Sequence, residues 1–327
     1  MPWSLYCPKC GWEGGSEEYY PFCPKCGSPL ELKGTIPVPP KPILGEGNTP
    51  LVEDERGVAY KLEYLNPTGS FKDRGTSYSL YLAKQLGYKC VVVDSSGNTA
   101  LSVAGYAGIL GLKARVHVPA SASKGKIALL KFMGAEVVVH PTRELAAEAA
   151  RRELEECFYV AHAMSPVFLK GIESLGRELA GEARNRTIFV PASSGTLLIG
   201  VYRGLVSQGA EPRIVAVQSP AAASLANRVK VLEKLGSKSR LLDALVVKNP
   251  PRIEEMAEAA TLGVVIVGDE YASVAWRRLA EKGFIVEPSS ATVLVASDAL
   301  GEAHPLLILT GSGLKYHDRM AEEIEAR

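Results

Sequence analysis

The chain has 327 residues, of which 46% are hydrophobic and 22% charged, a composition typical of a globular protein with a large core. Its 37 Lys and Arg residues balance 36 Asp and Glu residues, giving a net charge of +1, which favours neither nucleic acid nor an anionic membrane surface as a partner. The sequence has no apolar run of the roughly 18 residues that a membrane-spanning helix needs. Its N-terminus lacks the basic and apolar regions of a signal peptide, so we expect a cytoplasmic protein.

Two Cys-x-x-Cys-Gly knuckles lie near the N-terminus and contain four of the six cysteines: Cys7, Cys10, Cys23 and Cys26. Two thiolates separated by two residues can bind one metal from a tight turn, and two such turns complete a tetrahedral site. Because four protein ligands leave no open position, we predict a structural Zn²⁺ ion. Iron in a rubredoxin-like site is the main alternative, and two disulfides are disfavoured in a cytosolic chain.

The remaining cysteines, Cys90 and Cys157, stand in apolar contexts far apart in the chain, and we predict buried, inert thiols. We expect the zinc ribbon to occupy residues 1–35. The proline-rich segment 36–44 reads as an extended connector, since Pro fixes φ and lacks an N–H group.

From residue 45 onward, β-branched runs alternate with amphipathic stretches. The runs that predict strands are 91–94, 115–118, 136–140, 187–190, 213–217, 264–267 and 306–309, and the stretches that predict helices are 124–133, 143–156, 271–281 and 289–300. Near-continuous apolar strands alternating with helices predict parallel sheets covered on both faces. We therefore expect an α/β, doubly wound, mostly parallel architecture in two domains. The catalytic core would span residues 36–327, with a smaller subdomain inserted at about 78–160.

Polar loops follow several of these strands, at the edge where such sheets bind ligands. The segment Asn66–Gly75 predicts a loop leading into a helix that begins near Lys72, where the helix dipole disfavours the charged amine. The loops 95–99 and 193–196 each join a strand to a helix and could cradle anions with free N–H groups. An ordinary N-cap turn is the alternative for the first of them. Thr310, after the last strand, carries a hydroxyl that can hydrogen-bond a ring nitrogen.

Five motifs in this order make the chain resemble threonine synthase, a member of the fold type II (tryptophan-synthase-β-like) family of pyridoxal-phosphate (PLP) enzymes. They are Gly45–Leu51, Lys61–Gly75, Ser95–Thr99, Val286–Ala291 and Thr310–Lys315. The resemblance covers residues 45 to about 316, and its most specific part is Ser-Phe-Lys72-Asp-Arg-Gly. Some members of the family also carry an N-terminal zinc ribbon. The family implies a homodimer and a small amino-acid substrate, and the balanced charge predicts no nucleic-acid or membrane partner.

The resemblance also implies roles for individual residues. Lys72 would hold PLP as an internal aldimine and later act as acid and base at Cα. Thr310 would face the pyridine nitrogen and leave it neutral, which suits elimination and replacement rather than transamination. The other implied cofactor contacts are Asn98 at the 3′-oxygen and Ser193, Ser194, Gly195 and Thr196 at the phosphate. The implied contacts of the substrate carboxylate are Ser95, Ser96, Gly97 and Thr99.

Two departures from the family pattern bear on function. Ser193 and Thr196 stand where the phosphate loop usually has glycines. Phe168 falls where the family often has an arginine that meets the substrate phosphate, and a phenyl ring cannot neutralise a dianion. Lys170 or Lys61 could supply that charge instead.

These observations leave three functions to compare. The first is a PLP-dependent lyase of the threonine-synthase kind, which converts O-phospho-L-homoserine and water to L-threonine and phosphate. The second is a related dehydratase or β-replacement enzyme acting on serine, threonine or O-phosphoserine, which Phe168 favours. The third is a non-catalytic zinc-ribbon adaptor with a decayed core, against which the intact Lys72 argues.

Overall fold

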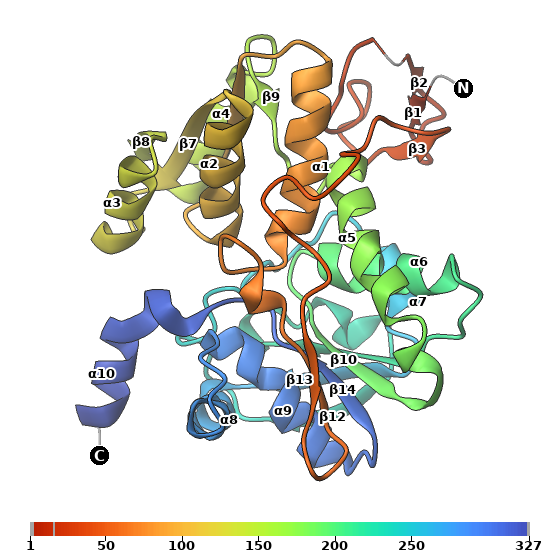
Figure 1. Ribbon diagram of the computed structural model, residues 1–327, viewed down its shortest axis with the longest axis vertical. Helices are drawn as coiled ribbons and strands as arrows, with labels where there is room; N and C mark the ends of the chain where they lie inside the picture. Colours follow the sequence, from red (N-terminus) through yellow and green to blue (C-terminus); the bar gives the residue numbers. More distant parts are fainter. Residues whose placement is uncertain (1–2, 16, 326–327) are drawn as a thin grey trace. The chain divides into compact units, whose positions relative to one another are not determined.

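A computed structural model describes residues 3–15 and 17–325 of the chain (Figure 1). Residues 1, 2 and 16 of the expected ribbon, and residues 326 and 327 of the expected core, lie outside this description. The chain forms two compact units. Residues 1–46 and 72–171 belong to the first unit, and residues 47–71 and 172–327 belong to the second.

The first unit contains two sheets. An antiparallel sheet in the order β2-β1-β3 joins the cysteine-rich segments, and a parallel sheet has the order β8-β7-β6-β9. The strands are β1 (Ser4–Tyr6), β2 (Glu13–Gly14), β3 (Glu31–Lys33), β6 (Cys90–Val93), β7 (Lys113–Pro119), β8 (Glu136–His140) and β9 (Phe158–Tyr159). The helices are α1 (Lys72–Gln85), α2 (Asn98–Leu110), α3 (Lys124–Phe132), α4 (Arg143–Arg152) and the first turns of α5 (Pro166–Leu179).

The second unit is built on a seven-stranded sheet in the order β12-β13-β11-β10-β14-β5-β4, parallel except for β4 against β5. Its strands are β4 (Leu51–Glu53), β5 (Ala59–Lys61), β10 (Thr187–Pro191), β11 (Ile214–Gln218), β12 (Val231–Leu235), β13 (Gly263–Val267) and β14 (Pro305–Ile308). Its helices, besides the rest of α5, are α6 (Thr196–Val206), α7 (Ile253–Ala259), α8 (Asp269–Glu281), α9 (Pro288–Leu300) and α10 (His317–Glu325).

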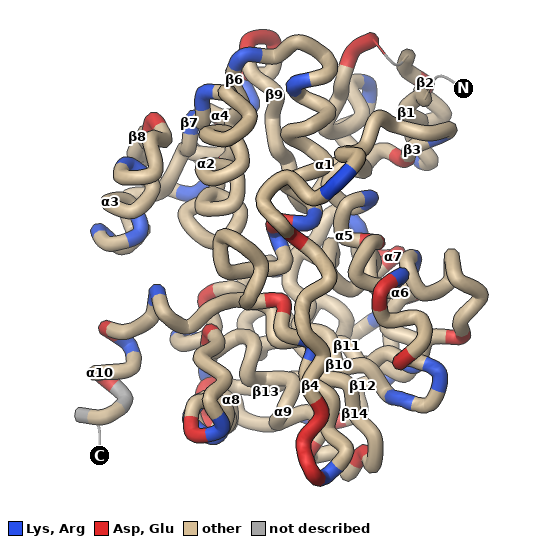
Figure 2. The backbone as a smooth tube through the Cα atoms, in the orientation of Figure 1, with Lys and Arg blue, Asp and Glu red and all other residues tan. Residues whose placement is uncertain are grey.

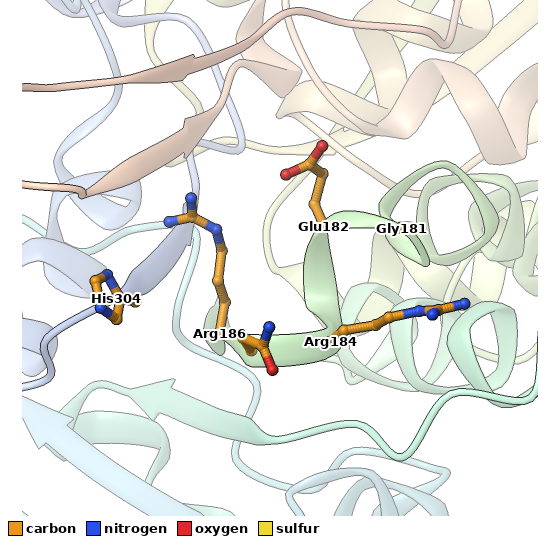
Figure 3. A pocket seen from close by; sticks show the side chains of 6 residues that line it. Gly181, Glu182, Arg184, Arg186 and His304 are labelled. Carbon is orange, nitrogen blue, oxygen red and sulfur yellow. The ribbon is translucent and has the colours of Figure 1, made fainter.

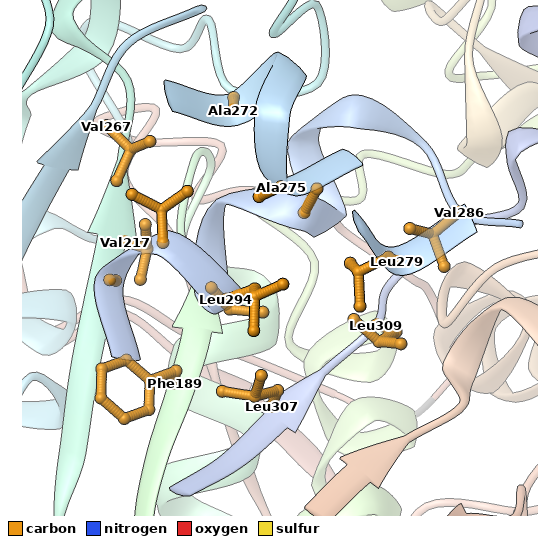
Figure 4. Close-up of a cluster of buried hydrophobic side chains, with 14 of the residues drawn as sticks. Phe189, Val217, Val267, Ala272, Ala275, Leu279, Val286, Leu294, Leu307 and Leu309 are labelled. Atoms are coloured by element: carbon orange, nitrogen blue, oxygen red, sulfur yellow. The ribbon is translucent and has the colours of Figure 1, made fainter. Parts of the chain in front are cut away.

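The packing of the second unit explains why the sequences of its strands are continuous apolar runs. Phe189, Val217 and Leu307 point from neighbouring strands into a cluster that includes Leu279 of α8 and Leu294 of α9 (Figure 4). The alternate residues of β10, β11, β13 and β14 are buried as well. Because both faces of the sheet are covered, the strands have no polar face to alternate with. The predicted α/β fold class is therefore confirmed.

Charges of both signs are interspersed along the backbone, as the composition suggested (Figure 2). Within residues 3–15 and 17–325, we find no helix with the length and apolar character required to cross a membrane.

The prediction that Cys90 and Cys157 are free thiols is wrong. Cys90 is the first residue of β6, Cys157 directly precedes β9, and the two strands pair in parallel with Val91 opposite Phe158. This register places the two cysteines side by side, and they form a disulfide. The sequence did not reveal the bond because the partners are 67 residues apart and only the strand pairing brings them together.

Candidate active site

The four N-terminal cysteines converge in the first unit. Their sulfur atoms all lie within 4.8 Å of one another, and none of the four is disulfide-bonded. The Sγ atoms of Cys7 and Cys26 are 3.6 Å apart, and those of Cys10 and Cys23 are 3.5 Å apart. Four thiolates at about 2.3 Å from one zinc ion would be roughly 3.8 Å from each other. The donor set therefore fits a tetrahedral metal ion.

Lys72 is the first residue of α1, as the sequence predicted. It is partly exposed, and its Nζ lies 5.9 Å from the ring centroid of Phe168. Phe168 is fully buried and packs so tightly against α1 that a Cβ at Gly75 would lie 2.5 Å from its ring. Phe168 therefore forms an apolar support beneath the lysine.

The loop 95–99 belongs to the same unit as this lysine. It follows β6, with Gly97 at the N-cap of α2 and Asn98 as the first helical residue. The Oγ of Ser102, one turn into α2, donates to the buried carboxylate of Asp73 at 2.6 Å. Because Asp73 is the neighbour of Lys72 in α1, this bond brings the first turns of the two helices together (Figure 1). Lys72 and Asn98 thus begin adjacent helices.

His162 and Arg143 add to this part of the first unit. Burial, together with the positive charges of Lys72 and Arg143, lowers the pKa of His162 to about 3, so the imidazole is neutral at pH 7. Burial raises the pKa of Asp94, and the charge of Arg143 is among those that oppose this shift. Arg143 begins α4 after β8, and β8 runs parallel to the sheet that carries Asp94 at the end of β6. Its side chain is therefore at the carboxyl edge of the sheet, a position that sequence reasoning missed.

The predicted phosphate loop lies in the second unit, between β10 and α6. Gly195 has a φ of +92°, and a Cβ there would lie 2.5 Å from the Met256 side chain, so only glycine fits. Ser193 accepts a hydrogen bond from the backbone of Val247 at 3.2 Å. The hydroxyls of Ser194 and Thr196 lie 3.2 Å apart at the start of α6. The helix N-terminus and these hydroxyls supply hydrogen-bond donors that suit an anion.

Thr310 is the centre of a hydrogen-bond chain with a defined direction. The Oγ of Ser290 accepts from the backbone N–H groups of Thr310 at 2.7 Å and Gly311 at 3.2 Å. The proton of Ser290 is therefore left for Thr310 Oγ1, 2.6 Å away. Thr310 in turn donates to the buried carboxylate of Glu287 at 3.1 Å, and Lys315 lies 3.7 Å from the same carboxylate. The Thr310 oxygen thus has one lone pair left and presents an acceptor to whatever lies beside it.

A comparison with known proteins assigns the chain to a family. A model of the family described as "Pyridoxal-phosphate dependent enzyme" matches residues 43–311. The chain belongs to this family. It is 29% identical over 307 residues to a threonine synthase from Bacillus sp. (strain ULM1), covering 85% of this chain and 86% of that enzyme. It is also 29% identical over 245 residues to an L-threonine ammonia-lyase from Thermotoga maritima, covering 72% of this chain and 61% of that enzyme.

Solved structures agree on the fold of this PLP-dependent enzyme. An O-ureido-L-serine synthase superimposes with a TM-score of 0.72 at 20% identity, covering 86% of this chain and 94% of that one. At this level of identity, the likeness concerns the fold alone.

The residues present fit the cofactor of the family. In the second unit, Ser70 Oγ is fully buried and has no hydrogen-bond partner within the described part of the chain. Ser70 pairs with Gly311 in an antiparallel bridge, and the N–H of Phe71 donates to the carbonyl of Thr310 at 3.1 Å. A buried polar atom without a partner is costly unless a ligand satisfies it. The unsatisfied hydroxyl, the glycine-dependent anion cradle and the Thr310 acceptor suit a polar ring that carries a phosphate.

A surface pocket of about 340 Å³ lies elsewhere in the second unit. It is lined by Gly181, Glu182, Arg184, Asn185, Arg186 and His304 (Figure 3). Arg186 and His304 directly precede β10 and β14, so the pocket is at the amino ends of strands whose carboxyl ends carry the candidate loops. Arg184 points away from Arg186 in Figure 3, and Arg186 donates to the carbonyl of Gly57 at 2.9 Å. These side chains do not converge on a common point, and we assign the pocket no part in the site.

Proposed function

We propose that this PLP-dependent enzyme is a lyase of the threonine-synthase kind, which converts O-phospho-L-homoserine and water to L-threonine and phosphate. The observation that carries the proposal is the placement of Lys72 at the start of α1, above Phe168 and beside the helix that begins at Asn98. The similarity to threonine synthases over most of the chain supports it. The bound cofactor would supply an electron sink for carbanion chemistry at the substrate.

The roles implied by the resemblance remain part of this proposal, apart from the protonation state of the ring nitrogen. Lys72 would hold the cofactor covalently and move a proton at the substrate Cα, while the cradle 193–196 would bind the cofactor phosphate. Asn98 would contact the cofactor's 3′-oxygen, and residues 95–97 and 99 would bind the substrate carboxylate. Thr310 would orient the ring through its nitrogen.

Because Phe168 stands where the family often has an arginine, recognition of a phosphorylated substrate needs a positive charge from another residue. Lys61 is unsuited, because it is buried and donates to the carbonyl of Thr49 at 2.7 Å and to Glu178 at 3.0 Å. Arg143 has the required charge, and its influence on His162 and Asp94 places that charge at the carboxyl edge of the first unit's parallel sheet. We assign the substrate phosphate to Arg143, whose guanidinium can bind it in bidentate fashion.

Phe168 favours a second candidate function. A fully buried phenyl ring near Lys72 offers no positive charge to the phosphate of O-phospho-L-homoserine. The similarity to an L-threonine ammonia-lyase agrees with this alternative. The alternative enzyme would be a dehydratase or β-replacement enzyme acting on serine, threonine or O-phosphoserine.

Product analysis separates the two functions. The protein loaded with PLP would be incubated with O-phospho-L-homoserine or with L-threonine, and inorganic phosphate, threonine and keto acid would be measured. We expect phosphate and threonine from the first substrate, and an Arg143→Gln variant should raise KM for it about tenfold or more, the scale of one charge-assisted contact. Arg152→Gln, at the other end of α4, is the matched control. Keto-acid release from threonine without phosphate release would establish the alternative.

The ribbon and the assembly are proposed on separate grounds. The mutual distances of the four cysteine sulfurs support a structural zinc ion. The homodimer is proposed from the resemblance to the family alone.

A further inference from the structure

The cysteine-rich segment contacts the core through a tyrosine that lies between its two knuckles. Tyr19 is buried, and its ring stacks on Phe158 of β9 with centroids 4.1 Å apart and an interplanar angle of 12°. Its hydroxyl donates to the Oγ of Ser165 at 2.5 Å. Tyr20, the next residue, is half-buried and donates instead to Glu18 within the same segment. Of these two tyrosines, Tyr19 is the one bonded to the core.

Ser165 is the N-cap residue of α5. The helix starts at Pro166, and Ser165 Oγ accepts a hydrogen bond from the N–H of Phe168 at 3.1 Å, the bond of an N-cap serine. The backbone carbonyl of Ser165 accepts from Leu169 at 3.2 Å. The Tyr19 hydroxyl therefore reaches the same oxygen atom that fixes the first turn of α5.

The first turns of α5 support the lysine. Phe168 lies beneath Lys72, with 5.9 Å between the ring centroid and Nζ. A Cβ at Gly75 would meet the Phe168 ring, and a Cβ at Gly171 would meet the carbonyl of Arg74, so α5 and the first turn of α1 are in close contact. Packing this tight transmits small displacements, because neither helix can shift without the other.

We propose that Tyr19 is a positioning residue for Lys72. Through this tyrosine, the cysteine-rich segment would influence the activity of the enzyme. The route is Tyr19 to the Ser165 cap, the cap to Phe168, and Phe168 to Lys72. This inference rests on the proposed role of Lys72 as the cofactor-binding lysine. It assigns the segment a function that its structural metal alone does not explain.

The test compares Tyr19→Phe with Tyr20→Phe in the full-length protein loaded with PLP. Phenylalanine keeps the stacking on Phe158 and removes only the hydroxyl, so folding should be preserved. For Tyr19→Phe we expect kcat to fall about three- to tenfold with little change in KM, the scale of one net hydrogen bond. The pH midpoint of the cofactor's visible absorbance should shift as well, because the surroundings of Lys72 change. Tyr20→Phe should leave kcat, KM and this midpoint unchanged.

Ser165→Ala tests the route itself. It should reproduce the loss of kcat and the shifted midpoint, and the Tyr19→Phe/Ser165→Ala double variant should lose little more than either single variant. If the loss of kcat in the double variant were the product of the two single losses, Tyr19 and Ser165 would act independently, and the proposed route would be wrong. A Tyr19→Phe enzyme with a lower melting temperature but an unchanged midpoint and kcat would also overturn the route. A wild-type protein without a cofactor absorbance band would overturn the proposed function itself.

Discussion

Lys72 owes its expected chemistry to the residue at which α1 begins. As the first residue of the helix, it lies at the positive end of the dipole, which disfavours the ammonium form. The buried ring of Phe168 lies beneath it, with its centroid 5.9 Å from Nζ. The helix dipole favours the neutral amine that must condense with an aldehyde.

Replacing this amine should therefore abolish covalent cofactor binding. In Lys72→Ala we expect no visible absorbance band of lysine-bound PLP and at least a thousandfold loss of activity, with an unchanged far-UV circular dichroism spectrum. Lys84→Ala, an exposed lysine in the last turn of the same helix, should behave as wild type. A wild-type absorbance band in Lys72→Ala would show that another amine holds the cofactor.

The direction of the hydrogen bonds around Thr310 changes the protonation state that we expect for the ring nitrogen of the cofactor. From the sequence, a hydroxyl partner was expected to leave that nitrogen neutral. In the structure, Ser290 Oγ accepts two backbone N–H groups and so donates its own hydrogen bond to Thr310, which donates to Glu287. A group that faces the remaining lone pair must donate, so a pyridine ring bound here would carry a proton on its nitrogen.

Glu287→Gln should reverse this arrangement. Lys315 lies near one carboxylate oxygen, so the glutamine oxygen should face Lys315 and its amide should donate to Thr310. Thr310 could then donate a hydrogen bond to the ring nitrogen, which would stay unprotonated and neutral. We expect the ¹⁵N shift of ring-labelled PLP to move from the pyridinium range to the pyridine range. Glu281→Gln, an exposed site in α8, should leave the shift unchanged, and an identical shift in Glu287→Gln would refute the assignment.

At the scale of elements, the short strand β9 is stabilised by a disulfide and an aromatic contact in addition to its pairing with β6. It has two residues, and the disulfide between Cys90 and Cys157 joins its N-terminal side to β6. The ring of Phe158 in this strand also stacks on Tyr19. The disulfide thus stabilises the strand that leads to the Ser165 cap and α5.

Removing the disulfide should lower stability more than activity. We expect Cys90→Ala/Cys157→Ala to lose about 2–4 kcal/mol of unfolding free energy, the usual range for a cross-link that closes a long loop. Chemical denaturation of the oxidised wild type, the reduced wild type and the double variant measures the difference. Equal stability of oxidised and reduced wild-type protein would show that the bond contributes nothing.

At the scale of the whole molecule, the chain forms two compact units, with residues 47–71 joining the C-terminal part of the chain. The expected limits of the ribbon (1–35), the core (36–327) and the inserted subdomain (78–160) remain predictions. The cysteine-rich sheet belongs to the same unit as α1 and α2, which carry Lys72 and Asn98. We therefore expect loss of the metal to lower activity through the contact of Tyr19 with Ser165, without unfolding the two larger sheets.

Metal removal tests this expectation. A Cys7→Ser/Cys10→Ser variant should lose one zinc ion per chain by elemental analysis and become sensitive to proteolysis within residues 1–35. Its core should stay folded, because the four cysteines lie in and around the antiparallel β2-β1-β3 sheet and not in the two larger sheets. A Cys90→Ala/Cys157→Ala protein is the matched control and should keep its zinc. Full metal content in the Cys7→Ser/Cys10→Ser variant would contradict the assignment of the knuckles.

By itself, the sequence determined the α/β class, the position of Lys72 at the start of a helix, and the loops that follow β6, β10 and β14. These features depend on local patterns: apolar runs, helical spacing and turn residues within a few positions of each other. The four knuckle cysteines were equally evident, since their spacing is the signal.

Tertiary structure alone decided which distant side chains share a bond. Cys90 meets Cys157 across 67 residues, Thr310 meets Glu287 across 23, and Tyr19 meets Ser165 across 146. Arg143 likewise comes near His162 only through the order of the parallel strands. No local pattern encodes such pairs, because strand order, register and helix packing determine them together. For this reason the position of Lys72 at the start of a helix was predictable from the sequence, whereas its packing on Phe168 and the hydrogen bonds around Thr310 were not.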